Sequence, residues 1–434
     1  MKETKVDKFV TETTDGVKSG YSELTLSNGV TVVLKQTDLK KDQVLLIGEG
    51  WGGSSLYGEK DFVNIKMFND VVEASGLGNF MHTELTKALA GKIAGASLSL
   101  SVQRTNINGS STPTDVETML QLVYLYMTGN IKKDQQSFDQ LMKTYELQLK
   151  NRLLQPEAVF ADSLGLTITK HNPRFKNLDV ADLPQVDYDR ILAMAKERTA
   201  NAAAFTFTII GNYDEAKIRP LIEQYLGSLP AQKNIVKGKD VSTDYTGKVV
   251  NNFKHKAETP KANAVLHWYS KEVPYTLENS IRAHMVAQVL QMVYLKEIRE
   301  EASAAYTVQA QASLDRDDFG DEAMILGYCP MKPEKADTAI FIMRRAVQDM
   351  AVGKCDADMV AKVKEYMLKS HADQLKTNGY WNGRINAWRK WKLDYHTDYE
   401  KTVQAMTPED LCAFVREVLK SGNEAEIVML PAEE

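Results

Sequence analysis

Arg299 and Tyr306 are the two residues whose types and spacing best suit the binding of a polarised carbonyl group. They lie in the stretch LKEIREEASAAYTVQA (295–310), where a charged helix end meets an alternating, strand-like segment. An arginine offers planar donors of fixed charge and a tyrosine hydroxyl adds one more, so a converging pair suits a peptide carbonyl or an oxyanion. The alternative is structural, because a cation at a helix end favours the negative end of the helix dipole and tyrosine is a common strand residue. The spacing alone leaves both interpretations open.

Other catalytic motifs are missing from the sequence. None of the seven histidines lies three or four residues from another, so no helix face presents an H-x-x-x-H or H-E-x-x-H pair. No G-x-S-x-G elbow is present, and the glycine-rich runs at 48–55 and 75–80 are typical of turns rather than of phosphate loops. The three cysteines, Cys329, Cys355 and Cys412, are too widely spaced for a disulfide framework or a zinc ribbon, and we expect free thiols.

Size and composition are those of a globular protein. A length of 434 residues predicts two or three domains. The net charge of −5 argues against a protein that binds nucleic-acid phosphates, and no apolar run approaches the roughly 18 residues that span a bilayer. The start, MKETKVDKFVTETTDG, is polar and lacks the apolar region of a signal peptide, with structure expected from about Tyr21. We therefore expect either a protein that stays where it is made or a piece of a longer polypeptide.

The first half of the chain predicts an α+β domain over residues 1–230. Asn28 and Gly29 lie between two alternating runs and predict a hairpin with a tight two-residue turn. Thr114, followed three residues later by Glu117, predicts the start of a helix. Apolar periodicity predicts the remaining elements: strands at 43–51, 96–103, 105–111 and 205–212, and helices at 61–75, 82–92, 133–155, 187–199 and ending at 226–230.

The pattern restarts after a polar, aperiodic stretch at 231–247, which we interpret as a linker to a second domain at 248–434. The elements expected there are strands at 263–270, 305–313, 322–329 and 424–430, and helices at 277–298, 333–352, 356–375, 384–395 and 407–420. The order of elements is similar in both halves, although the residues differ. We therefore predict two homologous α+β domains, each an antiparallel or mixed sheet with helices packed on one face. The cavity between such paired domains is a common place for a site.

The sequence resembles a known family over nearly its whole length, from about Ser22 to about Leu430. It is similar to the C-terminal half of pitrilysin/insulinase-type zinc peptidases, the inverzincins with H-x-x-E-H, and most of all to the bacterial periplasmic branch. The matching stretches, in family order, are LSNGVTVVLKQTD (26–38), GGSSLY (52–57), SGLGNF (75–80), LAGK (89–92), LQLVYLY (120–126), FTFTIIGNYD (205–214), YLGSLP (225–230), IREEASAAYTV (298–308) and NGYWNGRI (378–385).

The resemblance implies a fold and a division of labour. Such an enzyme is a clamshell of two halves, and its N-terminal half holds the zinc through H-x-x-E-H and a downstream Glu. The C-terminal half closes the chamber and supplies an Arg and a Tyr, seven residues apart, that bind the substrate backbone and help to stabilise the tetrahedral intermediate. Arg299 and Tyr306 match that pair in context and spacing. Where the metal motif would fall, this chain reads KMFND, from Lys66 to Asp70, without its histidines or glutamate.

Because water needs a metal with about three protein ligands to ionise near neutral pH, we expect neither a zinc site nor peptide hydrolysis in this chain alone. The resemblance implies a partner half that bears H-x-x-E-H and zinc, in the same longer chain or as a separate subunit, and a peptide substrate. It also suggests the periplasm or cell envelope. The alternative is a non-enzymatic scaffold or peptide-binding protein on the same fold; the Arg/Tyr pair favours the peptidase.

Overall fold

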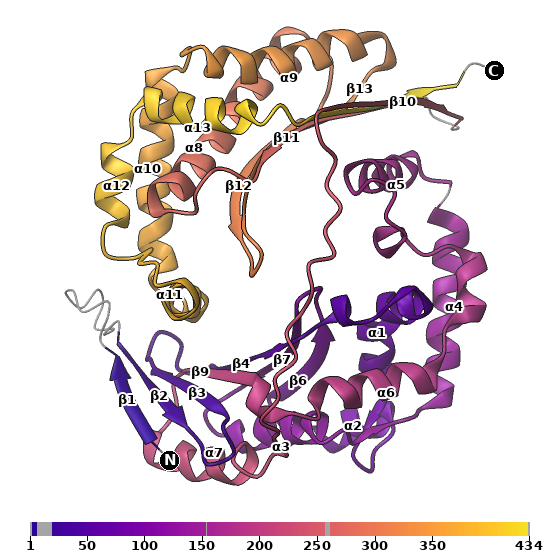
Figure 1. The fold of residues 1–434 in the computed structure, drawn as a ribbon, viewed down its shortest axis with the longest axis vertical. Coiled ribbons are helices and arrows are strands. Elements are labelled where there is room, and N and C mark those ends of the chain that lie inside the picture. Colours follow the sequence, from indigo (N-terminus) through magenta and orange to yellow (C-terminus); the bar gives the residue numbers. More distant parts are fainter. Residues whose placement is uncertain (1, 7–19, 153, 257–260, 433–434) are drawn as a thin grey trace. The chain divides into compact units, whose positions relative to one another are not determined.

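The structure, a computed structural model, describes residues 2–6, 20–152, 154–256 and 261–432 (Figure 1). By their internal contacts the residues form two compact units, and neither unit is continuous in sequence. The first unit contains residues 1–149, 178–241 and 374–390, and the second contains residues 150–177, 242–373 and 391–434. The expected domains, 1–230 and 248–434, differ from this division because two segments, 150–177 and 374–390, group with the other half of the chain.

The first unit is built on a seven-stranded sheet with the order β1-β2-β3-β9-β4-β7-β6, in which β3 and β9 are parallel and the other pairs are antiparallel. The sequence patterns had not predicted β1. The strands are β1 (Lys2–Val6), β2 (Tyr21–Thr25), β3 (Thr31–Gln36), β4 (Val44–Trp51), β6 (Ala94–Leu100), β7 (Arg104–Ser111) and β9 (Phe205–Gly211), with a separate ribbon of β5 (Gly76–Leu77) and β8 (Ile131–Lys132). The helices are α1 (Phe62–Ala74), α2 (His82–Ala88), α3 (Val116–Met127), α4 (Gln135–Arg152), α6 (Tyr188–Thr199) and α7 (Glu215–Tyr225).

The second unit contains a five-stranded sheet with the order β10-β14-β11-β13-β12. Its strands are β10 (Lys248–His255), β11 (Ala262–Ser270), β12 (Gln309–Arg316), β13 (Asp321–Met331) and β14 (Glu424–Pro431). Its helices are α5 (Pro156–Ile168), α8 (Leu277–Tyr294), α9 (Ala336–Ala351), α10 (Ala357–Gln374), α12 (Tyr399–Ala405) and α13 (Pro408–Lys420). The sequence patterns had predicted neither β10 nor α5.

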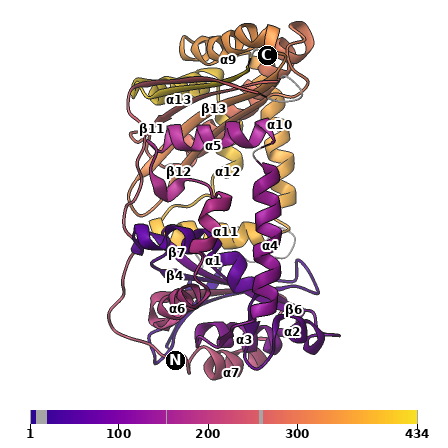
Figure 2. The same ribbon diagram turned by 90° about the vertical axis from the view of Figure 1, so that its right-hand side faces the viewer.

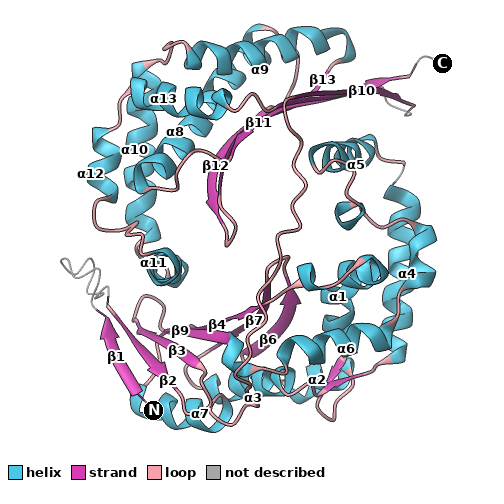
Figure 3. Cartoon of the chain, viewed as in Figure 1, coloured by secondary structure: helices cyan, strands magenta, loops and turns pink. Residues whose placement is uncertain are grey.

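The two units repeat one topology. The order β10-β14-β11-β13-β12 corresponds strand for strand to β3-β9-β4-β7-β6, and each series has one parallel pair, β10 with β14 and β3 with β9. A helix follows the middle strand in both: α1 after β4 and α8 after β11. The predicted α+β class is therefore confirmed (Figure 3).

The turn between β2 and β3 differs from the predicted two-residue turn. The last paired residues are Thr25 and Thr31, and the amide of Leu26 then donates to the carbonyl oxygen of Val30 at 2.9 Å. Only Gly29 takes a positive φ, 87°. The Asn28 side chain instead donates to the carbonyl oxygens of Leu226 and Leu229, at 2.9 and 3.1 Å. That tertiary contact ties the turn to the end of α7 and accounts for the longer loop.

Both faces of the first sheet are apolar, and different helices cover them. One face packs on the main helical layer through alternating side chains such as Val32, Leu34 and Leu46. On the other face, α11 (Asn378–Trp391) places Ile385 against Val33 and belongs to the same unit although it comes from the far end of the chain (Figures 1 and 2). Helices therefore lie on both faces of this sheet, rather than on one face as expected.

The second sheet shows the same arrangement. Alternate residues of β11 point in opposite directions: Leu266 faces the layer of α8, α9 and α13, whereas Val265 and Tyr269 face the other way. There they meet Phe160 of α5, a helix from the first half of the sequence, and Tyr245. Buried apolar faces on both sides of a sheet need a cover on each, and α5 supplies the second one.

The expected linker at 231–247 contains no helix or strand, but it is held in place. Within the first unit, the Lys239 amide donates to the Ser55 hydroxyl at 3.0 Å, and the Lys237 ammonium lies 4.6 Å from the centre of the Trp51 ring. The end of the stretch belongs to the second unit, where Tyr245 is buried. This segment is therefore an ordered strap.

We predict that Phe160→Ala destabilises the second unit by about 3 kcal/mol, because it removes a buried aromatic ring from the cover of that sheet. Hydrogen exchange should become faster in β11 and β14 and stay unchanged in β4 and β9. Leu154→Ala, which truncates a side chain that is 77% exposed, is the matched control. Faster exchange in the first unit alone would contradict the assignment of α5.

His267 lies on the face of β11 that α5 covers. The Tyr245 hydroxyl donates to the carbonyl oxygen of His267 and lies 2.9 Å from its Nδ1 atom. Burial lowers the pKa of His267 from 6.5 to about 4, and this effect exceeds the opposing one of the nearby Asp244. The imidazole is therefore neutral in the folded state at neutral pH.

This histidine gives folding a pH dependence with a definite sign. Between pH 6.5 and 4 the unfolded chain binds a proton that the folded chain does not, so stability should fall with pH by up to about 3 kcal/mol from this residue. Urea unfolding of the second unit at pH 7.5 and 4.5 measures the loss. His267→Gln should reduce the difference between the two conditions, whereas the exposed control His171→Gln should leave it unchanged. Equal losses in all three proteins would refute the role of His267.

Candidate functional site

Arg299 and Tyr306 lie on the connection from α8 to β12, in the second unit. Helix α8 continues into the π-helical segment Leu295–Glu301, which ends with the Ala302 amide donating to the Glu297 carbonyl oxygen at 3.0 Å. π-Helical turns are rare and frequent at functional sites. Arg299 belongs to this segment, at the helix end that the sequence predicted.

The backbone after the π-helical segment is fixed on both sides of Tyr306. Ser303 takes a left-handed conformation with φ of 50°, and the Ala304 amide then donates to the Ile298 carbonyl oxygen at 2.9 Å. The Lys332 amide donates to the carbonyl oxygen of Ala304 at 3.0 Å. Ala304 is fully buried and Val308 is 3% exposed, so the segment is anchored by small apolar residues.

Tyr306 does not lie on the strand where we expected it. Strand β12 begins at Gln309, and the chain before it is held by α8, since the Gln291 side chain donates to the Val308 carbonyl oxygen and accepts from the Ala310 amide. This side-chain bridge occupies backbone groups at the point where the strand begins. Tyr306 therefore lies in the loop.

Both candidate side chains reach solvent in this chain. Tyr306 is 90% exposed and forms no hydrogen bond with another residue of the described ranges. Arg299 is about half exposed, and its guanidinium pairs with the neighbouring Glu300 at 3.2 Å. An exposed pair of this kind contributes little to stability. The structure thus brings the two residues onto one short connection, without a hydrogen bond between them.

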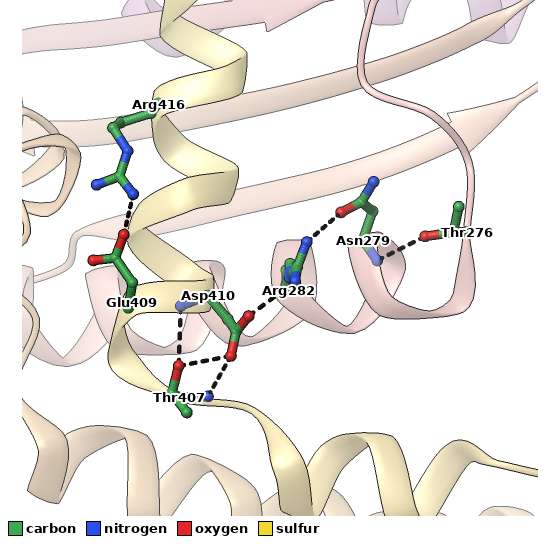
Figure 4. A network of polar contacts seen from close by, with 7 residues as sticks. All are labelled: Thr276, Asn279, Arg282, Thr407, Glu409, Asp410 and Arg416. Carbon is green, nitrogen blue, oxygen red and sulfur yellow. Dashed lines mark hydrogen bonds and ion pairs between the residues drawn. The ribbon is translucent and has the colours of Figure 1, made fainter.

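The N-terminal end of α8, away from Arg299, is held by a polar network (Figure 4). Arg282 donates to Asp410 of α13 at 2.9 Å and to Asn279 at 3.0 Å, and the Thr276 hydroxyl caps α8 by accepting from the Asn279 amide. Asp410 also forms a reciprocal cap with Thr407 at the start of α13. Although burial raises it, hydrogen bonds from Thr407 and Arg282 hold the pKa of Asp410 below its usual value. The helix that leads to Arg299 is therefore locked to α13.

The position expected for a zinc motif is occupied by other interactions. In α1, Lys66 lies over the Phe62 ring, Asn69 accepts from the Leu100 amide at 2.9 Å, and Asp70 accepts from the Tyr145 hydroxyl. Among the residues that the structure describes, no group of three or more His, Cys, Asp or Glu could hold a metal ion. The side chains at these positions do not fit zinc, which binds to sets of three or four ligands drawn from His, Cys and carboxylate side chains.

In comparison with known proteins, the chain is similar in sequence to zinc proteases. The zinc protease PQQL-like protein of Arabidopsis thaliana is 29% identical over 211 residues, 49% of this chain and 20% of the relative. The probable zinc protease PqqL of Escherichia coli (strain K12) is 23% identical over 405 residues, 92% of this chain and 42% of the relative. This chain therefore spans less than half the length of these relatives.

A family model and a solved structure add to this similarity. Residues 185–367 match the family model described as the peptidase M16 inactive domain. The crystal structure of the periplasmic protease PqqL from Escherichia coli has the same fold over 95% of this chain and 45% of the other, with a TM-score of 0.82 and 22% identity. The predicted resemblance is confirmed. In the described part of the chain, no helix is both long and apolar enough to span a bilayer.

Some residues that shape the site could not be found from the sequence. Gln291 lies in the middle of α8 and looks like any polar helix residue, yet it fixes the start of β12. Arg345 of α9 pairs with Glu297 in the π-helical segment, across 48 residues of sequence. Neither residue belongs to a local motif, so only the tertiary fold reveals them.

We predict that Asp410→Ala lowers the free energy of unfolding of the second unit by about 2 kcal/mol, because it removes a helix cap and leaves Arg282 without its anion. Urea unfolding measures the change. Glu409→Ala, at the adjacent position, breaks only an exposed pair with Arg416 and should cost less than about 0.5 kcal/mol. A loss for Asp410→Ala no larger than about 0.5 kcal/mol would show that the network contributes little to stability.

Proposed function

We propose that this chain is the non-metal half of a zinc metallopeptidase, in which Arg299 and Tyr306 bind the peptide backbone of a substrate held in a chamber that this half helps to close. The observation that carries the proposal is the exposure of Tyr306 on an anchored backbone. A large aromatic side chain that is 90% exposed contributes little to the fold, while Ala304, Ala305 and Val308 close to it in sequence are buried. The connection therefore holds the tyrosine side chain in solvent rather than against the core.

The chemistry of the pair suits a carbonyl oxygen that becomes negative. Arg299 is a permanent cation with planar donors, and its only ion pair among the described residues is the exposed one with Glu300. Tyr306 adds a neutral hydroxyl donor. Donors held on a fixed backbone stabilise an oxyanion without reorganising during the reaction, and one such donor is commonly worth 10²–10³ in rate. The two residues would act as binding and stabilising groups.

The zinc and the activated water belong, in this proposal, to a partner half that bears H-x-x-E-H. The M16 inactive domain at 185–367 and the coverage of less than half of the PqqL relatives support such a partner, either fused in a longer chain or separate. We also propose the periplasm as the compartment, because the PqqL structure is that of a periplasmic protease. The proposed substrate is a peptide, with no role for nucleic acid.

A second candidate is a non-enzymatic scaffold or peptide-binding protein on the same fold. Its support is the lack of a zinc donor set in α1. A scaffold would have no use for a hydroxyl at residue 306, and it would work equally well with phenylalanine there. The loss of a single oxygen atom therefore distinguishes the two candidates.

We predict that peptide cleavage appears only when this chain is combined with its H-x-x-E-H half, and that Tyr306→Phe then lowers kcat by roughly 10²-fold with a smaller effect on KM. A fluorogenic peptide measures both constants. Tyr366→Phe, which removes the same atom from another exposed tyrosine, is the control and should be neutral.

Two outcomes would contradict the assigned roles. Cleavage by this chain alone, together with stoichiometric zinc by metal analysis, would show that the chain contains its own metal site. Unchanged kinetics of Tyr306→Phe in the active combination would favour the scaffold.

A further inference from the structure

Two of the three cysteines meet in the second unit. Cys412 lies on α13 and is fully buried, and Cys355 lies in the turn between α9 and α10. Their thiols are near enough to each other that each contributes to the pKa of the other. One helical turn beyond Cys412, the Arg416 guanidinium donates to the carbonyl oxygen of Ala351 at 3.3 Å. That contact independently ties α13 to the end of α9, next to the turn that carries Cys355.

The two thiols differ in their access to solvent. Cys355 is partly exposed and lines an open cavity of about 440 Å³, whose other walls include Val293 and Lys296 from the α8 side and Met359 of α10. Cys412 does not line this cavity and is 0% exposed. A small reagent can therefore reach Cys355 directly, whereas Cys412 is not accessible from solvent.

We propose that Cys355 and Cys412 form a reversible disulfide when the chain meets a small-molecule disulfide such as oxidised glutathione. In the first step the Cys355 thiolate attacks one sulfur of the reagent, forms a mixed disulfide and releases one glutathione thiolate. In the second step the Cys412 thiolate attacks the Cys355 sulfur and releases the second glutathione thiolate. The two cysteines lose two protons and two electrons, and the reagent is reduced to two thiols.

Burial sets the rate of the exchange. It raises the pKa of the Cys355 thiol to about 12, with a smaller contribution from Cys412, and it raises the pKa of Cys412 as well. The thiolate is the reacting form, so exchange at neutral pH should be slow. The charged groups around the pair are Asp356 beside Cys355, Glu409 and Arg416 on α13, and Lys296, Glu297, Asp349 and Lys354 around the cavity.

The cross-link would constrain a long part of the chain. It closes the segment that contains α10, α11 and α12, and α11 is the helix that covers the second face of the first sheet. A disulfide that closes a loop of this length stabilises the fold mainly by restricting the unfolded chain. We expect the midpoint of thermal unfolding of the second unit to rise by roughly 5 °C on oxidation and to return on reduction.

The test uses the full chain, incubated under native conditions with oxidised glutathione, followed by intact mass and thiol counting after denaturation. The wild-type chain should lose the mass of two hydrogens and keep one free thiol. Cys412→Ser should instead gain one glutathione on Cys355, and Cys355→Ser should stay unmodified because Cys412 is inaccessible. Cys329→Ser, which removes the third, buried thiol, should form the same cross-link as the wild type.

Three results of the mass and thiol measurements would overturn the proposed disulfide. A wild-type chain that keeps all three thiols, or that retains a glutathione without closing the disulfide, would overturn it. A cross-link that persists in Cys412→Ser would also overturn it, because another cysteine would then be the partner. The proposal does not depend on peptidase activity, so the two can fail separately.

Discussion

The constraint on which this fold depends is that each sheet has two apolar faces and its own helical layer covers only one. In both units the second face is covered by a helix from the other half of the sequence: α5 places Phe160 against Val265, and α11 places Ile385 against Val33. Leaving either face in water would forfeit the burial that stabilises the sheet. Neither unit is therefore complete as a continuous stretch of chain, because each takes the cover of its second sheet face from the other half of the sequence.

The presentation of the candidate site follows from that packed frame. Helix α8 is fixed at its start by the network around Arg282 and at its end by buried residues such as Ile298. The connection to β12 then has little freedom, because Ala304 and Ala305 are buried and the Gln291 side chain holds the backbone where β12 begins. Under these conditions an exposed Tyr306 costs the fold little and its backbone is already ordered, which reduces the entropy lost when a ligand binds.

The sequence predicted the helices and strands with a clear apolar periodicity, and it missed those that depend on packing or pairing with distant segments. Helices such as α13 and strands such as β9 were expected within a few residues of their bounds. Helix α5 was missed because Gly165 and Thr167 interrupt its apolar spacing, and β10 because its KVVNNFKH run reads as polar, although it pairs with β14. No local sequence pattern shows that a helix packs on a sheet formed by the other half of the sequence. The site residues came from the family resemblance, since their spacing alone left a structural interpretation open.

The two units also share a hydrogen bond between a helix side chain and the edge strand, which no sequence pattern predicts. In each, a side-chain amide on the helix after the middle strand accepts from a backbone amide of the edge strand: Asn69 from Leu100 of β6, and Gln291 from Ala310 of β12. An edge strand with unpaired amides invites the addition of another strand, so both helices limit that risk, α1 at the end of β6 and α8 near the start of β12. The units diverge beyond this point. Helix α1 ends at Ala74, whereas α8 continues into the π-helical segment that carries Arg299. The extension, rather than the shared frame, is what gives the second unit its candidate site.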